Sequence, residues 1–519
     1  MTTITPAAAP TPPVAADKPL PSEAVVAPAA AAGGAAAKTY NEFLVLLDDQ
    51  ANRAVEKAFK MKVGPERRQY VAKTLIDNMM KTQQPLWDVL DGLEHAGHVG
   101  SYQPLWIQNA IVVDGDETAE AVMSSAAGVA QATRSAHHLL DTPSATNGKF
   151  EPEVIAGVND VTAVDPAEGK DDPQWNLTRM KVANAAKEKL DGSGVTVGVI
   201  DTGVDVSHPA LKDKYRGYDP ATGSSSHTAN WYDATEEASP EPVDKGEHGT
   251  HVMGTIGGKF NGDQTGVAPG VQFIAARGLG EQGGSDGMLL KSFQAMVAPR
   301  VPTPGVSPGS RRELGLGADV INNSWGSVDG LSMSYANALR NMDAMGVINV
   351  FAAGNDGQGG KAGSVGSPGS SPHIVTVGAI DKSDKVAEFS SRGPNPIPTS
   401  DGEPVPFVSA PGVDIRSSIP GGGYERGWQG TSMATPAITG FIALAQQAAQ
   451  EETGAKFDTA AMRDVLKRVA QDVDEKGVDD NTGYGVPVVN NLRKAVIAVA
   501  KDRGLMETKP APKKAPAKA

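Results

Sequence analysis

Five short runs of apolar residues, separated by segments with helical periodicity, limit the folds open to this chain more than any other feature. The runs are VTVGVI (195–200), VQFIAAR (271–277), DVINNS (319–324), VINVFAAG (347–354) and IVTVGAI (374–380). They are apolar almost throughout rather than alternating, which is typical of parallel strands covered by helices on both faces. The sequence therefore predicts a three-layer α/β domain with a mainly parallel sheet over residues 175–503.

A smaller unit is expected ahead of this domain. Residues 39–140 combine strand-like patterns at 42–50 and 104–115 with helical patterns at 65–97 and 117–129. These patterns predict a compact α+β domain.

Four segments lack such patterns. Residues 1–38 are rich in Ala and Pro with few large apolar side chains, which predicts disorder. Residues 141–174 are polar and predict a linker, and residues 299–316 predict a Pro/Gly-rich surface insertion. Residues 504–519 form a basic Lys/Ala/Pro tail, interpreted as a solvated tail, with a docking segment for an acidic partner as the alternative.

Composition excludes several classes of function. The net charge of −14 and the pI of about 5.2 argue against a nucleic-acid partner, which would require a basic surface. The chain has no cysteine and therefore no disulfide, thiolate metal site or thiol nucleophile. No apolar run is long enough to span a bilayer, so no membrane partner is expected. The first residues hold no basic residue before Lys18 and are interrupted by prolines, unlike a secretory signal peptide.

The stretch GEHGTHVMGT (246–255) contains two histidines, His248 and His251. As a metal pair they would need further His, Cys or carboxylate ligands, and neither Gly249 nor Thr250 can serve. A single histidine that acts as a base at the start of a helix fits the stretch better.

Three other polar residues follow strands or begin a helix. Asp201 follows a strand, where an aspartate is commonly a turn or cap residue but can also orient a histidine. Asn355 follows another strand and is either a turn residue or a donor to an oxyanion. Ser432 begins an apolar helix, as a cap or as a nucleophile that requires a neighbouring base.

Taken together, these stretches are similar to those of the subtilisin-like serine proteases, the subtilases (peptidase family S8). The matching text is VIDTGVDVSHP, HGTHVMGT, GVAPG, NNSWG, AAGND, FSSRGPN, APGVDI and GTSMATP, between about 175 and 450. The resemblance implies peptide-bond hydrolysis through an acyl-enzyme, with no cofactor needed for the chemistry. It implies that Asp201 orients the base, His248 is the base and then the acid, Ser432 is the nucleophile, and Asn355 with the Ser432 N–H forms the oxyanion hole. His251 is then structural.

The resemblance also implies a substrate cleft. Its implied residues are Gly283, Gly284, Ser285, Ser324, Trp325, Gly326, Gly354 and Gly366. The first six would pair with the substrate backbone, and the last two would line the S1 pocket. A glycine floor predicts broad specificity with a preference for bulky apolar P1 residues, and Asp356 at the rim would also admit a basic residue.

Structural calcium is left open, and no metal ligand is assigned. Many subtilases carry an aspartate ligand where this chain has Ala210. The corresponding loop GGKFNGDQTG (257–266) keeps Asn261 and Asp263 as oxygen donors.

The unit at 39–140 resembles an inhibitor-type propeptide, and FQAMVAP, NNSWG and YQPLWIQNAIVV resemble the bacillopeptidase F-like branch of the family. We therefore expect a self-processing zymogen cut between about 138 and 174, in which the propeptide is an intramolecular inhibitor. The family implies an extracellular enzyme, with cytoplasmic storage or non-classical export as alternatives.

An active endopeptidase acting on proteins or peptides is the leading hypothesis. The alternatives are a subtilase scaffold that binds without cutting and a latent cytoplasmic protease with one narrow substrate.

Overall fold

The computed structural model describes residues 40–138, 173–280, 283–302, 310–327, 334–397 and 402–506. The predicted disordered segment at 1–38, nearly all of the predicted linker, and the tail from 507 onward lie outside the described residues. Within the described part of the chain, no helix is both long and apolar enough to cross a bilayer.

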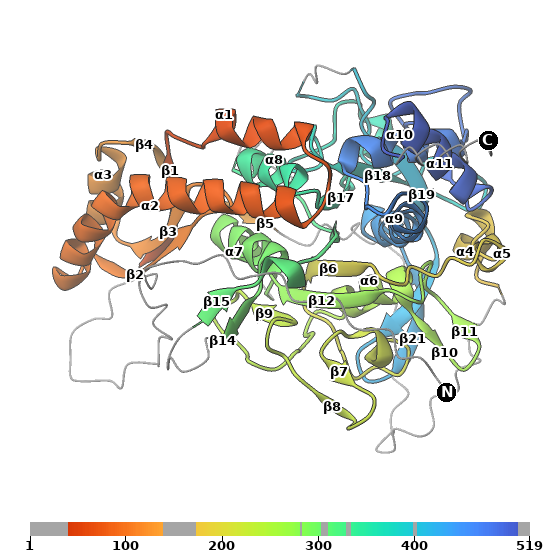
Figure 1. Cartoon of the computed structure of the whole chain (residues 1–519), viewed down its shortest axis with the longest axis horizontal. Coiled ribbons are helices and arrows are strands. Elements are labelled where there is room, and N and C mark those ends of the chain that lie inside the picture. Colours follow the sequence, from red (N-terminus) through yellow and green to blue (C-terminus); the bar gives the residue numbers. More distant parts are fainter. Residues whose placement is uncertain are drawn as a thin grey trace, which may run out of the picture.

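One parallel sheet of seven strands forms the centre of the larger unit (Figure 1). Its order is β19 (Val408–Pro411), β18 (Val375–Ile380), β17 (Ile348–Ala352), β16 (Val320–Asn323), β6 (Thr196–Asp201), β12 (Gln272–Arg277) and β9 (Trp231–Asp233). All five predicted runs are strands of this sheet, so the predicted α/β architecture is confirmed. Strands β9 and β19 were not predicted from the sequence, because three or four residues are too few to show a periodic pattern.

Helices cover both faces of this sheet. On one face lie α6 (His248–Gly257) and α9 (Thr431–Thr453), which contact each other. On the other lie α7 (Asp286–Val297) and α8 (Ala336–Ala344). Outside α9 pack α10 (Thr459–Val469) and α11 (Leu492–Asp502).

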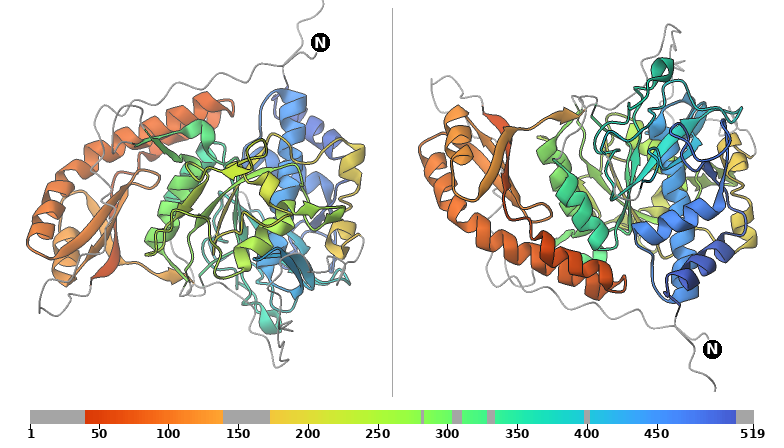
Figure 2. Two further views of the ribbon diagram at one scale, coloured as in Figure 1. Left: turned by 90° about the horizontal axis from the view of Figure 1, so that it is seen from below. Right: turned by 90° about the horizontal axis from the view of Figure 1, so that it is seen from above.

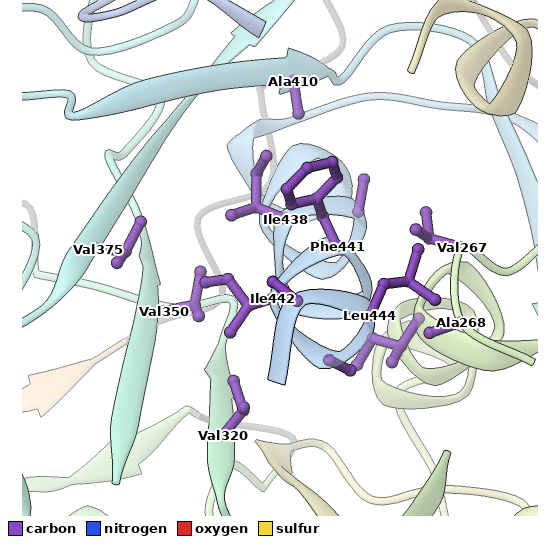
Figure 3. Packing of buried hydrophobic residues seen from close by; sticks show 14 of the residues in the cluster. Val267, Ala268, Val320, Val350, Val375, Ala410, Ile438, Phe441, Ile442 and Leu444 are labelled. Carbon is purple, nitrogen blue, oxygen red and sulfur yellow. The ribbon is translucent and has the colours of Figure 1, made fainter. Parts of the chain in front are cut away.

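Helix α9 is buried along most of its length, as expected for a helix that is apolar on all sides. Figure 3 shows Ile438, Phe441 and Ile442 of α9 beside Val350 and Val375 of the sheet. Complete burial of one such side chain contributes about 1.5–3 kcal/mol. This packing fixes the N-terminus of α9 over the carboxyl ends of the strands.

The smaller unit is an antiparallel sheet of four strands with helices on one face. The sheet order is β2 (Val99–Leu105), β3 (Ala110–Gly115), β1 (Asn41–Leu47) and β4 (Val129–Arg134), and the helices are α2 (Pro65–His95) and α3 (Glu117–Ser124). The predicted α+β fold is confirmed. The single strand predicted at 104–115 is wrong, because the chain reverses between β2 and β3. Gln83 Nε2 donates to the carbonyls on both sides of that turn, at Leu105 (3.0 Å) and Ala110 (3.1 Å).

The two units pack directly against each other (Figure 2). In that view the smaller unit, orange, lies against the green helices α7 and α8, away from α9. Trp106 and Ile107 are buried in one apolar cluster with side chains of α7 and α8. Their backbone groups also bond across the contact, with Trp106 N–H to Gln294 Oε1 at 2.8 Å and Asn341 Nδ2 to the Ile107 carbonyl at 2.8 Å.

The remaining elements are short. They are α1 (Asn52–Val55), η1 (Glu56–Lys60), β5 (His137–His138), α4 (Trp175–Arg179), α5 (Asn184–Lys187), η2 (Lys212–Lys214), β7 (Tyr218–Asp219), β8 (Ser224–Ser225), β10 (Lys259–Phe260), β11 (Asp263–Gln264), β13 (Gly284–Ser285), β14 (Arg300–Pro302), β15 (Ser310–Arg312), η3 (Leu314–Leu316), η4 (Gln358–Gly360), β20 (Ile415–Ile419), β21 (Gly423–Trp428), β22 (Ala470–Gln471) and β23 (Val486–Pro487). The predicted insertion at 299–316 contains the hairpin β14–β15.

Candidate active site

The four polar residues singled out from the sequence lie at the carboxyl end of the parallel sheet or at helix N-termini. Asp201 is the last residue of β6, and His248 is the first residue of α6. Asn355 follows β17, and Ser432 is the second residue of α9. All four are almost completely buried. Parallel α/β sheets form their sites at this end because the loops that leave the strands converge there.

Asp201 and His248 form a buried hydrogen-bonded pair. The distance between His248 Nδ1 and Asp201 Oδ1 is 2.7 Å, and Thr202 N–H donates to the same carboxylate oxygen at 2.8 Å. Burial lowers the pKa of His248, but the charge and hydrogen bond of Asp201 outweigh it, so the pKa lies above its ordinary value. The pair therefore orients the imidazole and favours its protonated form.

Asp244, which was not among the predicted site residues, links the two elements that carry this pair. Its Oδ1 accepts from Thr202 Oγ1 at 2.7 Å, and its Oδ2 accepts from the N–H (2.8 Å) and the hydroxyl (2.6 Å) of Thr250. Burial raises the pKa of Asp244. The available signal was an aspartate four residues before the candidate base, in a loop rich in charged residues.

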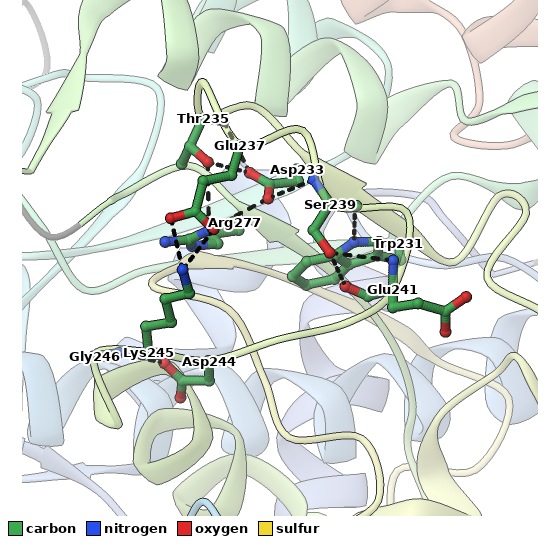
Figure 4. A network of polar contacts seen from close by, with 10 residues as sticks. All are labelled: Trp231, Asp233, Thr235, Glu237, Ser239, Glu241, Asp244, Lys245, Gly246 and Arg277. Carbon is green, nitrogen blue, oxygen red and sulfur yellow. Dashed lines mark hydrogen bonds and ion pairs between the residues drawn. The ribbon is translucent and has the colours of Figure 1, made fainter. Parts of the chain in front are cut away.

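A charged network supports the loop that contains Asp244 (Figure 4). Arg277 ends β12, in register with Asp201 on β6. Its guanidinium lies 3.4 Å from Asp233 and 3.0 Å from Glu237, and Lys245 lies 2.7 Å from Glu237. The hydrogen bonds from Lys245 and Arg277 lower the pKa of Glu237. The loop is thus fixed both to the sheet and to the start of α6.

Ser432 occupies a helix N-terminus with an unusual local structure. Gly430 precedes the helix with φ of 146°, a backbone conformation that favours glycine. Pro436 has no N–H to donate to the Ser432 carbonyl one turn earlier, and Ser324 Oγ donates to that carbonyl instead, at 3.0 Å. The Ser432 hydroxyl donates to the Ser324 carbonyl at 3.1 Å, and within the described residues no hydrogen bond joins it to His248.

The Asn355 amide is held in one orientation. Its Oδ1 accepts from Thr431 N–H at 2.9 Å and from Thr431 Oγ1 at 3.1 Å. Because the oxygen faces Thr431, the Nδ2 side of the amide is the donor side. Ser432, in the first turn of α9, contributes a backbone N–H that has no partner within the helix. Gly354, with φ of 105°, places Asn355 at this point.

The residues for which the resemblance implies backbone pairing with substrate lie in two segments. On one side, β13 pairs in antiparallel register with β5 of the smaller unit, so part of this chain already lies along that edge. On the other side, the Ser324 hydroxyl donates to the Ser432 carbonyl of α9, and Trp325 is 1% exposed. Gly326 completes that side.

Gly366 lies against the backbone of Ser327. A Cβ at position 366 would meet the Ser327 carbonyl oxygen at 2.3 Å, so this close approach requires glycine. Ser327 N–H also donates to the Ser367 carbonyl at 2.8 Å. The segment predicted to form the floor of the S1 pocket is thus held against Ser327 by backbone contact.

The surroundings of His251 differ from those of the Asp201–His248 pair. Its ring is fully buried and stacks on Trp428, with ring centroids 4.5 Å apart. Burial, reinforced by the neighbouring His248, lowers the pKa of His251 to about 3. His251 therefore stays neutral and packs. Among the described residues, no group of three or more His, Cys, Asp or Glu side chains is placed to hold a metal ion.

The loop considered for calcium contains a buried ion pair. Both carboxylate oxygens of Asp263 accept from Arg416, at 3.2 and 3.0 Å, and both side chains are buried. Asn261 is exposed. A guanidinium thus neutralises Asp263 from within the chain, and the donor set does not fit a metal ion at this carboxylate.

Comparison with known proteins extends these observations. Residues 192–485 match the subtilase family (peptidase S8). Bacillopeptidase F of Bacillus subtilis (strain 168) is 33% identical over 494 residues, which cover 91% of this chain and 32% of that protein. Fervidolysin of Fervidobacterium pennivorans is 31% identical over 352 residues (63% of this chain, 44% of that protein), and subtilisin E of Bacillus subtilis (strain 168) is 30% identical over 272 residues (52% and 60%). The chain thus spans about a third to three fifths of these relatives.

Proposed function

The chain belongs to the subtilase family, and from that premise we propose that it is a serine endopeptidase that cleaves proteins or peptides through an acyl-enzyme. The observation that carries this proposal is the buried 2.7 Å contact between Asp201 and His248, together with the packing of α6, which begins at His248, against α9, whose second residue is Ser432. All groups that acyl transfer requires lie at one end of one sheet.

In the proposed reaction, Ser432 Oγ attacks the scissile carbonyl carbon while His248 Nε2 takes the hydroxyl proton. Asp201 stabilises the resulting imidazolium through its hydrogen bond to Nδ1. The carbonyl oxygen becomes an oxyanion that accepts from Asn355 Nδ2 and the Ser432 N–H. His248 then protonates the leaving amine as the C–N bond breaks, and water attacks the acyl-enzyme by the same route in reverse.

The Ser432 hydroxyl must turn before it can react. It now donates to the Ser324 carbonyl, and the proposed reaction requires it to donate to His248 Nε2 instead. Hydrogen bonds of this type are often long or misaligned without substrate and tighten when it binds. No cofactor is needed for these steps.

The smaller unit is proposed to be the propeptide of a zymogen. Its strand β5 pairs with β13, and a strand in that place blocks an incoming substrate. Arg67 of α2, 1% exposed, adds a polar anchor by donating to the Ala344 carbonyl at 2.7 Å and pairing with Asp458 at 3.1 Å. Maturation would then require a cut after this segment, between about 138 and 174.

The substrate range is proposed to be broad, with a preference for bulky apolar P1 residues. Backbone pairing along the cleft reads chain shape and not sequence. An extracellular site of action is proposed as well, and one relative at 29% identity is named minor extracellular protease Epr, from Bacillus subtilis (strain 168).

The deciding experiment compares the full chain with Ser432→Ala. The wild type should shorten with time and cleave a peptide with an apolar P1 residue, and loss of the nucleophile should lower turnover on the order of 10⁶-fold. N-terminal sequencing of the shortened chain locates the maturation cut. A wild type that neither shortens nor cleaves, and so matches Ser432→Ala, would leave the non-cutting scaffold as the function.

A further inference from the structure

The segment that borders the proposed cleft carries a histidine that is completely enclosed. His138, in β5, pairs with Gly284 of β13 and is 0% exposed. The backbone contact continues two residues earlier, where Asp286 N–H donates to the Ala136 carbonyl at 3.1 Å. The chain around His138 therefore lies as an extended substrate would lie, with one side chain pointing into the protein.

The pocket that receives His138 has aromatic walls. The ring centroids of His138 and Tyr335 are 5.5 Å apart, and those of His138 and Trp325 are 6.2 Å apart. Phe293 packs against both of these rings, and its ring centroid lies 5.9 Å from that of Trp325 and 6.1 Å from that of Tyr335. The His138 ring thus makes a tilted contact with Trp325 and an edge-on contact with Tyr335, so an aromatic side chain packs well at this position.

The pocket also holds a charged acceptor. Asp286 Oδ1 lies 2.6 Å from His138 Nε2 and accepts from the Tyr335 hydroxyl at 2.5 Å. Burial raises the pKa of Asp286, but the hydrogen bonds from His138 and Tyr335 outweigh it and hold the pKa below its ordinary value. The carboxylate therefore remains ionised at neutral pH and needs hydrogen-bond donors.

Histidine satisfies both properties of the pocket. It is flat, and its Nε2–H reaches the carboxylate. A Phe or Leu side chain would fill the space but would leave the buried carboxylate with one donor fewer, which is costly.

We propose that Asp286 and Tyr335 make this pocket a specificity subsite that selects substrate chains with a histidine at the position opposite Gly284. The inference rests on the proposed protease function and adds a polar requirement to a cleft that otherwise reads backbone. By this inference, the propeptide carries the same residue as the preferred substrates.

The test uses the full chain after it has processed itself. The enzyme digests a mixed peptide library, and mass spectrometry of the products counts the residues at each position before the cut. The wild type should enrich histidine over phenylalanine about 10- to 100-fold at one position on that side, the range expected for a hydrogen bond to a charged group.

Two variants locate the effect. Asp286→Asn keeps the shape, removes the charge and should lower the histidine enrichment at that position about tenfold. Asp356→Asn, a matched acid at the rim of the predicted S1 pocket, should leave that enrichment in place and change only the residue directly before the cut. Cleavage without histidine enrichment, or enrichment unchanged in Asp286→Asn, would overturn the inference while leaving the protease function intact. A library left uncut would instead overturn the protease function.

A second measurement needs no catalysis. In the full chain with Ser432→Ala, His138→Phe keeps an aromatic ring but removes the donor. Amide hydrogen exchange across β5 should become about tenfold faster, while the exposed control Gln131→Ala on β4 should not change it. Equal exchange in both variants would show that the Asp286 contact does not hold the strand.

Discussion

The Ser324 hydroxyl donates a hydrogen bond of 3.0 Å to the backbone carbonyl of Ser432. The helix cannot supply that bond, since the residue four positions on is Pro436. The segment that follows β16 and the N-terminus of α9 are thus joined at the point where the helix lacks one of its own hydrogen bonds.

This contact predicts a coupling between two substitutions. Ser324→Ala leaves the carbonyl without a donor and should lower the free energy of unfolding by about 1–3 kcal/mol. In a Pro436→Ala background, the new N–H can donate to the carbonyl, so Ser324→Ala should cost clearly less. Urea unfolding of the four Ser432→Ala chains measures the coupling. Equal costs in both backgrounds would contradict the explanation.

His251→Phe should make the protein more tolerant of acid. The pKa of His251 is lowered to about 3, so between its ordinary pKa and about 3 the unfolded chain binds a proton that the folded chain does not. Stability therefore falls as the pH falls through that window, by about 1.4 kcal/mol per pH unit for one group. His251→Phe keeps the stacking on Trp428 and should reduce this slope. Unfolding curves from pH 7 to pH 4, in the Ser432→Ala chain, provide the measurement.

The same variant tests which histidine is the base. His251→Phe should keep peptidase activity within about tenfold, whereas His248→Ala should abolish it. Equal losses of activity in two folded variants would contradict the assignment of His248 as the base.

Asp201→Asn should shift the acid limb of the pH–rate profile. Catalysis needs neutral His248, and the charge of Asp201 raises the pKa of His248, so its removal should move the limb to lower pH. Turnover should also fall by about 10⁴-fold, because the amide favours the wrong tautomer. The dependence of kcat/KM on pH shows both effects. An acid limb that stays in place would show that Asp201 does not set the pKa of His248.

Asp244→Asn should lower kcat by about 10- to 100-fold with little change in KM. Asp244 holds Thr202 beside Asp201 and Thr250 beside His248, and small misplacements of a base cost about that much. Glu237→Gln is the control, since Glu237 supports the same loop from the exposed side. Matched effects of the two variants would assign the loss to the loop and not to Asp244.

Arg416→Met should destabilise the protein by about 3–5 kcal/mol, because it leaves the buried Asp263 carboxylate unpaired. The double variant with Asp263→Asn should recover most of that loss. Thermal unfolding of the three Ser432→Ala chains measures the recovery. A double variant no more stable than Arg416→Met would show that the pair is not the source of the stability.

The central sheet could be predicted because burial on both faces makes each strand a continuous apolar run, which can be recognised in the sequence strand by strand. Val320 and Val350 belong to apolar runs whatever their partners are. The candidate reactive residues could be found because each sits in a short local pattern. The pairing of Asp263 with Arg416, 153 residues apart, has no such local pattern. Neither does the position of His138 against Asp286, since each residue alone reads as an ordinary polar side chain.

The turn between β2 and β3 was missed for a related reason. Trp106 and Ile107 are apolar and continue the strand pattern, yet they are buried against α7 and α8 and not within their own sheet. An apolar residue in a sequence indicates that its side chain is buried, but it does not indicate which of the two units the side chain packs against.

The pairing of β5 with β13 also affects how copies of the full chain interact with one another. An edge strand with free backbone groups can pair with any extended chain, including another copy of the same protein, and such edges promote association between molecules. In the full chain, the backbone of β13 is already paired. Strand β5, which is proposed to block substrate, would then also protect the edge of β13 from pairing with other copies of the protein during synthesis.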